Sequence, residues 1–115
     1  MENDLGYVLI ASMSIEPDKK ELFNQVYDKH VEHLLEVPGV RSVTRLKGEP
    51  FKIAIGDEIK QIPAPHPIYT AIYELESPDV LESDAWSAAV EKGRWASEIR
   101  PFTSNRSHYL FRKLD

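Results

Sequence analysis

The stretch at positions 27–40, YDKHVEHLLEVPGV, constrains the fold of this chain more than any other. Phe23, Tyr27, His30 and Leu34 recur with the period of a helix that buries one face. Proline and glycine follow at 38–39, a combination that ends helices, and the β-branched Val40 then opens a new segment. The sequence therefore predicts an amphipathic helix with a histidine on its inner face, followed directly by a strand.

Short runs rich in apolar and β-branched residues predict strands at 7–13, about 40–47, 68–75 and 108–113. Two alternating runs around Gly56-Asp57 predict a hairpin over 51–62. A serine cap at Ser83 predicts a second helix that runs to about Ile99, before Pro101. This order favours an α+β, ferredoxin-like βαββαβ domain covering residues 1–115. We expect an antiparallel four-stranded sheet, two helices on one face, and the hairpin inserted between strands two and three.

The strands at 7–13 and 68–75 are apolar at nearly every position, whereas a half-exposed antiparallel strand should alternate. Both faces of the sheet therefore require cover, and the helices of one chain cover only one. A homodimer that buries sheet against sheet is the expected solution. Tyr69 and Tyr73 share one face of their strand, which meets either the helices or the partner. The interface is slightly favoured because tyrosine is common there.

Composition excludes several classes of site and partner. The 115 residues contain no cysteine, so disulfides, zinc–thiolate sites and thiol nucleophiles are excluded. The net charge is −5 and no basic patch is evident, which argues against nucleic-acid binding. No apolar run is long enough to span a bilayer. The acidic N-terminus, Met1 to Asp4, lacks a secretion-signal pattern, so we expect a cytoplasmic protein without a membrane partner.

A motif in the first half of the chain resembles a known family. It comprises Phe23-Asn24 with Tyr27-Asp28, then His30, Leu34-Leu35, Val37-Pro38-Gly39 and Arg45. Together with the element order, this is similar to the dimeric α/β-barrel superfamily, nearest its ethyl tert-butyl ether degradation (EthD)-like branch. The sequence departs from the branch pattern at Val26, where tryptophan is usual, and at Glu32, where proline is usual.

The resemblance implies a range of activities rather than one. Superfamily members include cofactor-free quinone-forming monooxygenases, polyketide cyclases, muconolactone isomerases and haem-degrading oxygenases. The haem-degrading set uses an asparagine near the first strand together with a tryptophan and a histidine. The strand at 7–13 has no asparagine, so the resemblance does not favour haem degradation.

His30 is the candidate catalytic residue. A neutral imidazole in a partly dry cleft between helix and sheet could act as general base on an acidic C–H or a phenol. The alternative is a core histidine tied to a carbonyl or to Tyr27. His33, three residues further on, could share a metal with His30, with Asp28 or Glu32 as a third ligand, although a surface role is favoured, and no metal site is predicted.

The candidate substrate-binding residues are Tyr27, Tyr73, Trp86 and Arg100. The tyrosine hydroxyls could orient a carbonyl or enol, Trp86 could form a wall of the cleft, and Arg100 could bind a carboxylate through two hydrogen bonds. For Trp86 the alternative is a core filler, and for Arg100 a surface ion pair at a helix end. Trp95 falls on a different helical stripe and is expected to meet another surface.

Two functional hypotheses remain. The first is an enzyme without a bound cofactor, of monooxygenase, cyclase or isomerase type, acting on a small aromatic or polyketide-like molecule. The second is a non-catalytic homodimer, either a ligand-binding or a stress-related accessory protein. An open cleft reaching an unbonded His30 would support the first, and a filled core with His30 bonded to a carbonyl would support the second.

Overall fold

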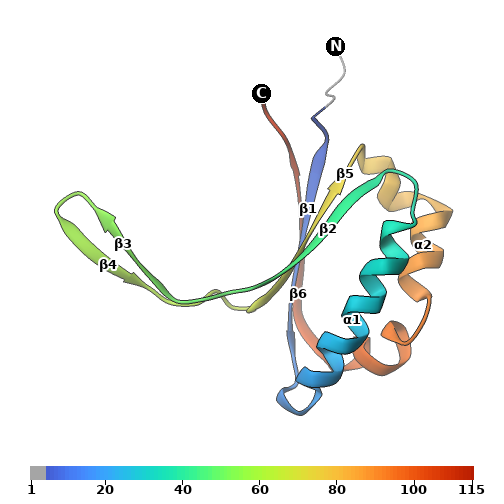
Figure 1. Ribbon diagram of the computed structural model, residues 1–115, viewed down its shortest axis with the longest axis horizontal. Coiled ribbons are helices and arrows are strands. Elements are labelled where there is room, and N and C mark those ends of the chain that lie inside the picture. The colour runs from blue at the N-terminus through green and yellow to red at the C-terminus, as the bar shows by residue number, and fades with distance from the viewer. Residues whose placement is uncertain (1–4) are drawn as a thin grey trace.

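The computed structural model describes residues 5–115, and in that range the elements follow the predicted order (Figure 1). Met1 to Asp4, on which the expectation about a secretion signal depends, lie outside the described residues. The strands and helices are β1 (Tyr7–Ile15), α1 (Lys20–Leu35), β2 (Val40–Lys47), β3 (Phe51–Ile55), β4 (Glu58–Ile62), β5 (Tyr69–Leu75), α2 (Asp84–Glu91) and β6 (Thr103–Arg112). Short 3₁₀ turns lie at Pro17–Lys19, Pro78–Glu82 and Arg100–Phe102, and a π-helical turn lies at Trp95–Ile99.

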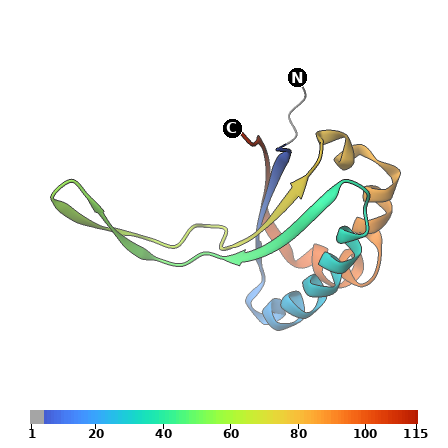
Figure 2. The ribbon, with the colours of Figure 1, turned by 45° about the horizontal axis from the view of Figure 1, so that its top comes forward.

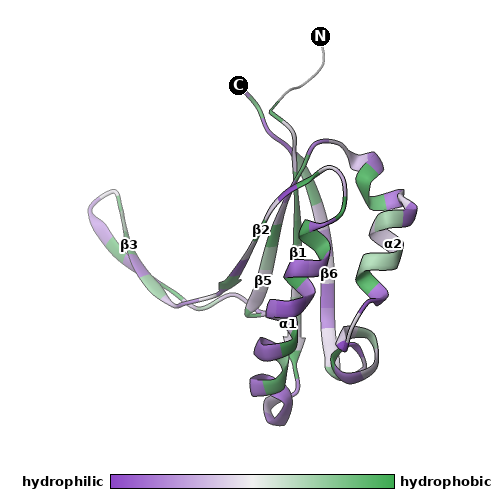
Figure 3. Cartoon of the chain, turned by 45° about the vertical axis from the view of Figure 1, so that its right-hand side comes forward, coloured by the Kyte–Doolittle hydropathy of each residue, from purple (hydrophilic) through white to green (hydrophobic). Residues whose placement is uncertain are grey.

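Four strands form one antiparallel sheet in the order β2-β5-β1-β6, and β3 pairs with β4 in a separate two-stranded sheet. Both helices cover the same face of the four-stranded sheet, and the hairpin stands off on the other side (Figures 1 and 2). The predicted ferredoxin-like α+β architecture is confirmed. The predicted inserted hairpin is also confirmed, as β3 and β4 between β2 and β5. Each helix carries hydrophilic and hydrophobic bands, as a helix covering a sheet should (Figure 3).

The predicted stripe of α1 forms one wall of the core. Phe23, Tyr27, His30 and Leu34 are all buried, together with Val26. The opposing wall consists of alternate residues of the two central strands, because side chains of a strand alternate between its faces. These core residues are Leu9, Ala11 and Met13 of β1 and Tyr69, Ala71, Tyr73 and Leu75 of β5.

The slight preference for Tyr69 and Tyr73 at the partner interface was wrong. Both are buried on the helical face, where Tyr69 lies opposite Met13 and Tyr73 opposite Leu9. The ring of Phe23 lies 4.9 Å from that of Tyr69. The other face of β5 carries Thr70, Ile72 and Glu74, so alternation along the strand favours the face of the two tyrosines as the buried one.

The end of α1 follows the prediction. The helix ends at Leu35, and Gly39 has a backbone φ of +93°, a conformation that other residues adopt only with strain. A Cβ at Gly39 would lie 2.4 Å from Cγ2 of Val80. The glycine therefore allows both the reversal of the chain and the close approach of the segment that leads into α2.

The predicted second helix, from Ser83 to Ile99, was too long. Ser83 does cap α2, accepting a hydrogen bond from the backbone N–H of Trp86, but α2 ends at Glu91. Gly93, with φ of +75°, breaks the helix, and the chain continues in the π-helical turn at Trp95–Ile99. Two strands are also longer than predicted, since β1 extends to Ile15 and β6 starts at Thr103. Within residues 5–115, no helix is long and apolar enough to cross a membrane.

Candidate functional site

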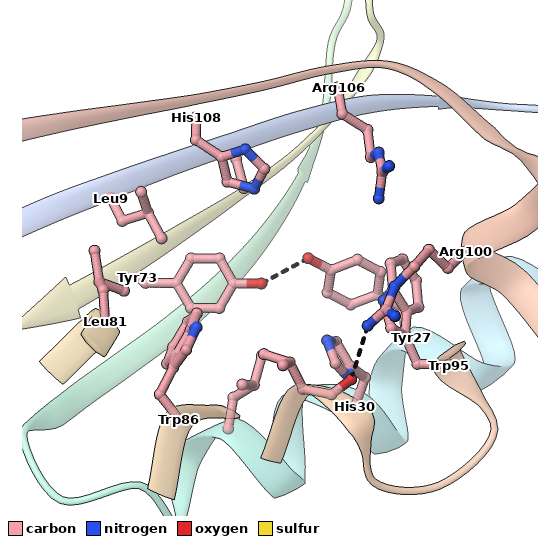
Figure 4. Close-up of a pocket in the computed structure, with 13 residues that line it drawn as sticks. Leu9, Tyr27, His30, Tyr73, Leu81, Trp86, Trp95, Arg100, Arg106 and His108 are labelled. Carbon is pink, nitrogen blue, oxygen red and sulfur yellow. Dashed lines mark hydrogen bonds between the residues drawn. The ribbon is translucent and has the colours of Figure 1, made fainter. Parts of the chain in front are cut away.

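A cavity of about 380 Å³ lies between the helical layer and the sheet (Figure 4). It brings together side chains from α1, α2, the π-helical turn and strands β1, β5 and β6. All five residues proposed from the sequence line it, namely His30, Tyr27, Tyr73, Trp86 and Arg100. Their functional roles stay predictions, but a single space now connects them.

His30 projects from α1 into this space and is only 5% exposed. Its ring stacks on the indole of Trp95, with ring centres 4.7 Å apart and planes 16° apart. Tyr27 meets it edge to face, with ring centres 5.5 Å apart. Among residues 5–115, His30 Nδ1 is a buried nitrogen without a hydrogen-bond partner. Nδ1 therefore bonds neither to a carbonyl nor to Tyr27, as the alternative of a core histidine would require.

The surroundings of His30 disfavour its protonated form. Burial lowers its pKa from 6.5 to about 4, and the nearby His33 and Arg100 act in the same direction. Glu91 has the opposite, smaller effect. His30 is consequently an uncharged imidazole at neutral pH, able to accept a proton or a hydrogen bond from a molecule in the cavity.

Tyr27 and Tyr73 join helix to sheet through their hydroxyl groups, whose oxygens lie 2.7 Å apart. Burial raises the pKa of Tyr27, and it raises that of Tyr73 well above the ordinary value. Both hydroxyls therefore stay protonated at neutral pH. Two hydroxyls supply two O–H donors but need only one for their mutual bond, so the second is available to a carbonyl or enolate oxygen.

Arg45 of β2 fixes the start of α1 to the edge of the sheet. Its guanidinium donates to Oδ1 of Asn24 at 2.6 Å and to Oδ1 of Asp28 at 2.9 Å. It also lies over the ring of Tyr27, 4.8 Å from the ring centre. The motif residues Asn24, Tyr27, Asp28 and Arg45 thus form one cluster, which orients Tyr27 toward the cavity.

The cavity carries positive charge and hydrogen-bond donors. Arg100 and Arg106 line it together with His30 and His108, and no acidic residue is among the described residues that do so. Arg100 is held by Glu91 through two hydrogen bonds of 2.5 and 3.1 Å and donates to the carbonyl of Val90. A ligand with a carboxylate or an acidic hydroxyl suits this lining better than a neutral hydrocarbon.

Three of the aromatic or basic lining residues were not predicted as part of the site: Trp95, Arg106 and His108. Trp95 was expected to meet another surface, but the break after α2 rotates it onto His30. Arg106 and His108 belong to β6 and share a face two residues apart, with His108 opposite Ala11 of the core. His108 lies within the predicted strand, and an earlier start of that strand would have placed Arg106 on the same face by alternation.

The metal site considered at His33 is not formed. Across residues 5–115, no group of three or more histidine or acidic side chains is placed to hold a metal ion. Asp28 is paired with Arg45, and Glu32 pairs with Lys29 at 3.6 Å. His33 instead lines a smaller cavity of about 290 Å³, which is also bordered by His30 and Trp95.

The sequence matches no protein-family model and no curated protein. Solved structures do match it over most of its length. SnoaB, a cofactor-independent oxygenase from Streptomyces nogalater, is 16% identical with a TM-score of 0.58, covering 96% of this chain and 95% of its own. The haem degrader MhuD from Mycobacterium tuberculosis, with two haems in its active site, is 15% identical with a TM-score of 0.58, covering 95% and 97%. An ethyl tert-butyl ether degradation (EthD) family protein from Bacillus halodurans is 13% identical with a TM-score of 0.57, covering 95% and 99%.

Identities this low establish the fold alone, yet the three proteins agree on it over nearly the whole chain. They include an oxygenase and an EthD protein, as the motif between Phe23 and Arg45 led us to expect. The chain therefore has the ferredoxin-like fold of the dimeric α/β-barrel proteins, with an EthD protein among its structural neighbours.

Proposed function

We propose that this protein binds a small aromatic or polyketide-like molecule in the cavity at His30 and transforms it without a bound cofactor. The observation that carries the proposal is the buried, unpartnered Nδ1 of His30 beside a cavity of about 380 Å³. Buried nitrogen atoms are nearly always hydrogen-bonded, and the exceptions often serve a ligand or a reaction. A mainly apolar cavity with a few convergent polar groups is the usual form of a small-molecule site.

The first chemical step would be a proton transfer from the ligand to His30. An acidic C–H or phenol placed against the neutral imidazole loses its proton to the ring nitrogen and leaves a carbanion, enolate or phenolate. The free hydroxyl proton of the Tyr27–Tyr73 pair and the guanidinium of Arg100 would then stabilise the negative charge. Charge on the ligand also raises the proton affinity of His30, so the weak base of the empty site becomes stronger when the anion forms.

The fate of that anion distinguishes three reaction classes. Attack on molecular oxygen gives a monooxygenase, attack on a carbonyl within the same molecule gives a cyclase, and reprotonation at another carbon gives an isomerase. SnoaB, which is described as a cofactor-independent oxygenase, supports the first class by its fold. All three begin with the same proton transfer, so His30 is required in each.

The chain is suited to a direct binding assay, because both of its tryptophans, Trp86 and Trp95, line the cavity. Ligand entry should change their fluorescence. A panel of hydroxynaphthoic acids, anthrones and unsaturated lactone acids tests the proposal, with naphthalene as a neutral comparison and haem as the ligand of MhuD. Oxygen consumption and product masses then report turnover.

His30→Gln should abolish turnover while keeping ligand binding, and His33→Gln is the matched control on the same helix. Binding without turnover in the wild-type protein would favour the non-catalytic alternative, a ligand-binding accessory protein. A panel in which no aromatic compound changes the fluorescence would refute the proposal, and a response to haem alone would move the protein toward the haem-binding relatives.

We further propose that the protein is a homodimer that packs through the open face of its sheet. Ile10 of β1 lies between Ile72 and Tyr109 on this face, and Val8 lies opposite Phe111. Tyr109 and Phe111 are 61% and 55% exposed, which is costly for an apolar surface in a lone protomer. Tyr109→Glu should produce a monomer in sedimentation analysis, because its side chain lies outside the core of the protomer.

A further inference from the structure

The hairpin β3–β4 stands apart from the rest of the chain. Every residue of β3 is exposed, and the hairpin pairs only with itself among the described strands. The radius of gyration is 16.2 Å, whereas a compact domain of this length has about 13 Å. We call residues 51–62 the arm.

One face of the arm, which we call its apolar face, carries four of the five large apolar side chains of the hairpin. The strand register places Phe51, Ile53 and Ile55 on the same face, with Phe51 opposite Ile62. The three β3 residues are 52%, 42% and 52% exposed. Lys60 and Glu58 lie opposite Ile53 and Ile55 at the edge of this face and form an ion pair. The other face carries Lys52 opposite Gln61 and Ala54 opposite Ile59. An isolated two-stranded hairpin is marginally stable in water, so this apolar face requires a surface to pack against.

The stem of the arm is built to hold a direction. Gly48 donates its backbone N–H to the carbonyl of Ile68 at 2.7 Å, which closes the stem above β2 and β5. A Cβ at Gly48 would lie 2.3 Å from Cγ of Pro65, so the two sides of the stem are in close contact. Prolines at 50, 63, 65 and 67 restrict the backbone on both sides. The arm is therefore pre-oriented rather than loosely tethered.

The direction of the arm is informative. Figures 1, 2 and 3 all place it on the side of the four-stranded sheet away from α1 and α2. That is the side on which Tyr109 and Phe111 are exposed. A second copy packed on the open sheet face would lie about 10 Å from this sheet, beside the arm. The eight residues from Gly48 to Ile55 span roughly 26 Å when extended, which exceeds that spacing.

We propose that the arm is a clamp that packs its apolar face on the flank of a second copy of this chain, past the partner's sheet and against its helical layer. The inference rests on the sheet-face homodimer proposed above. A two-fold axis would give each protomer one arm and one flank that receives the partner's arm. The same contact, formed twice, would then cover the apolar faces of both arms. A hollow of about 420 Å³ at the base of the arm, bordered by Phe51 and Ile62, offers space for a side chain of the partner.

Matched substitutions on the two faces of the arm test the clamp. Ile53→Glu puts a carboxylate on the apolar face opposite Lys60, which keeps the hairpin itself favourable. Ala54→Glu adds the same charge on the other face, opposite Ile59. Sedimentation equilibrium should show a dimer dissociation constant at least about tenfold weaker for Ile53→Glu, and one within about twofold of wild type for Ala54→Glu. Equal dissociation constants for the two variants would overturn the clamp.

Tyr109→Glu separates failure of the clamp from failure of its premise. If Tyr109→Glu dissociates the dimer while Ile53→Glu does not, the sheet-face dimer stands and the clamp is refuted. A wild-type protein that is monomeric at all concentrations refutes both. Neither result affects ligand binding at His30, which Trp86 and Trp95 report independently.

A cross-linking experiment locates the arm directly. The chain has no cysteine, so Ile55→Cys can carry a single benzophenone maleimide near the tip of the arm. Irradiation should yield a covalent dimer whose cross-linked peptide belongs to the partner's helices or its adjoining edge strand. The same label in a Tyr109→Glu background should give no dimer. A label that reacts only within its own protomer would refute the clamp.

Discussion

The buried, neutral state of His30 predicts a specific loss of stability in mild acid. The pKa of this histidine is about 4 in the folded protein and 6.5 as an ordinary exposed group. Between those values the unfolded chain binds more protons than the folded one, so the free energy of unfolding falls as pH falls through this window. Above about pH 6.5 protonation of His30 costs the folded protein no stability. Below about pH 4 the loss in the free energy of unfolding is greatest, at roughly 3 kcal/mol.

Between about pH 7.5 and pH 5, linkage gives a loss of about 2 kcal/mol from this one residue. For a chain of 115 residues, this corresponds to roughly 8 °C in the midpoint of thermal unfolding. Urea unfolding measures the loss, at one fixed protein concentration because the stability of an associating protein depends on its concentration. The difference between wild type and His30→Gln isolates the histidine from the carboxylates.

His66→Gln is the matched control, because His66 is exposed and lies outside the cavity. It should keep the full pH dependence of the wild-type protein, whereas His30→Gln should lose about 2 kcal/mol of it. Wild type and His30→Gln with parallel stability profiles between pH 7.5 and pH 5 would show that His30 is not held in its neutral form by burial.

Three further substitutions test the surroundings of the cavity. Tyr73→Phe removes the hydroxyl bond to Tyr27 and should cost about 1 kcal/mol in urea unfolding. If Tyr27→Phe and Tyr73→Phe combined cost as much as the sum of the two single variants, the result would contradict a shared bond. Arg45→Ala should lower stability by roughly 1–2 kcal/mol, through its lost bonds to α1. Lys47→Ala on the same strand should have little effect. Equal losses for the two variants would argue against a stabilising role of the Arg45 bonds to α1. Arg100→Gln should weaken an aromatic acid about tenfold in the fluorescence titration and leave a neutral analogue unchanged, since one charged hydrogen bond is worth about 1.5 kcal/mol; equal weakening of both would refute the role of charge.

The parts of the site carried by α1 could be predicted because the helix has a single apolar stripe. Phe23, Tyr27, His30 and Leu34 repeat at helical spacing, so one decision about the period places all four on the buried face. The stop at Gly39 was readable for a similar reason, since a local turn needs that residue type whatever the rest of the fold. In both cases, residues close together in the sequence determine the local conformation without long-range contacts.

The remaining parts depended on long-range packing. Tyr69 and Tyr73 share a face of β5, and the register of β5 with β1 shows that the helices cover this face. Trp95 reaches His30 because the helix breaks at Gly93, and a single glycine within an alanine-rich helical pattern was not enough to predict the break. Arg106 was missed because β6 begins five residues before the predicted strand, whereas His108 was its first predicted residue and only the register with β1 shows its face.

The central claim, that the unpartnered nitrogen of His30 faces a ligand site, is tested most directly by nuclear magnetic resonance of the imidazole nitrogens. Their shifts should report a neutral ring at pH 7, and titration with an aromatic acid from the panel should move the His30 resonances while those of His66 stay in place. A saturable change of this kind, alongside quenching of Trp86 and Trp95, is the predicted result. His30 resonances that no member of the panel moves, or a ring already protonated at pH 7, would contradict the account.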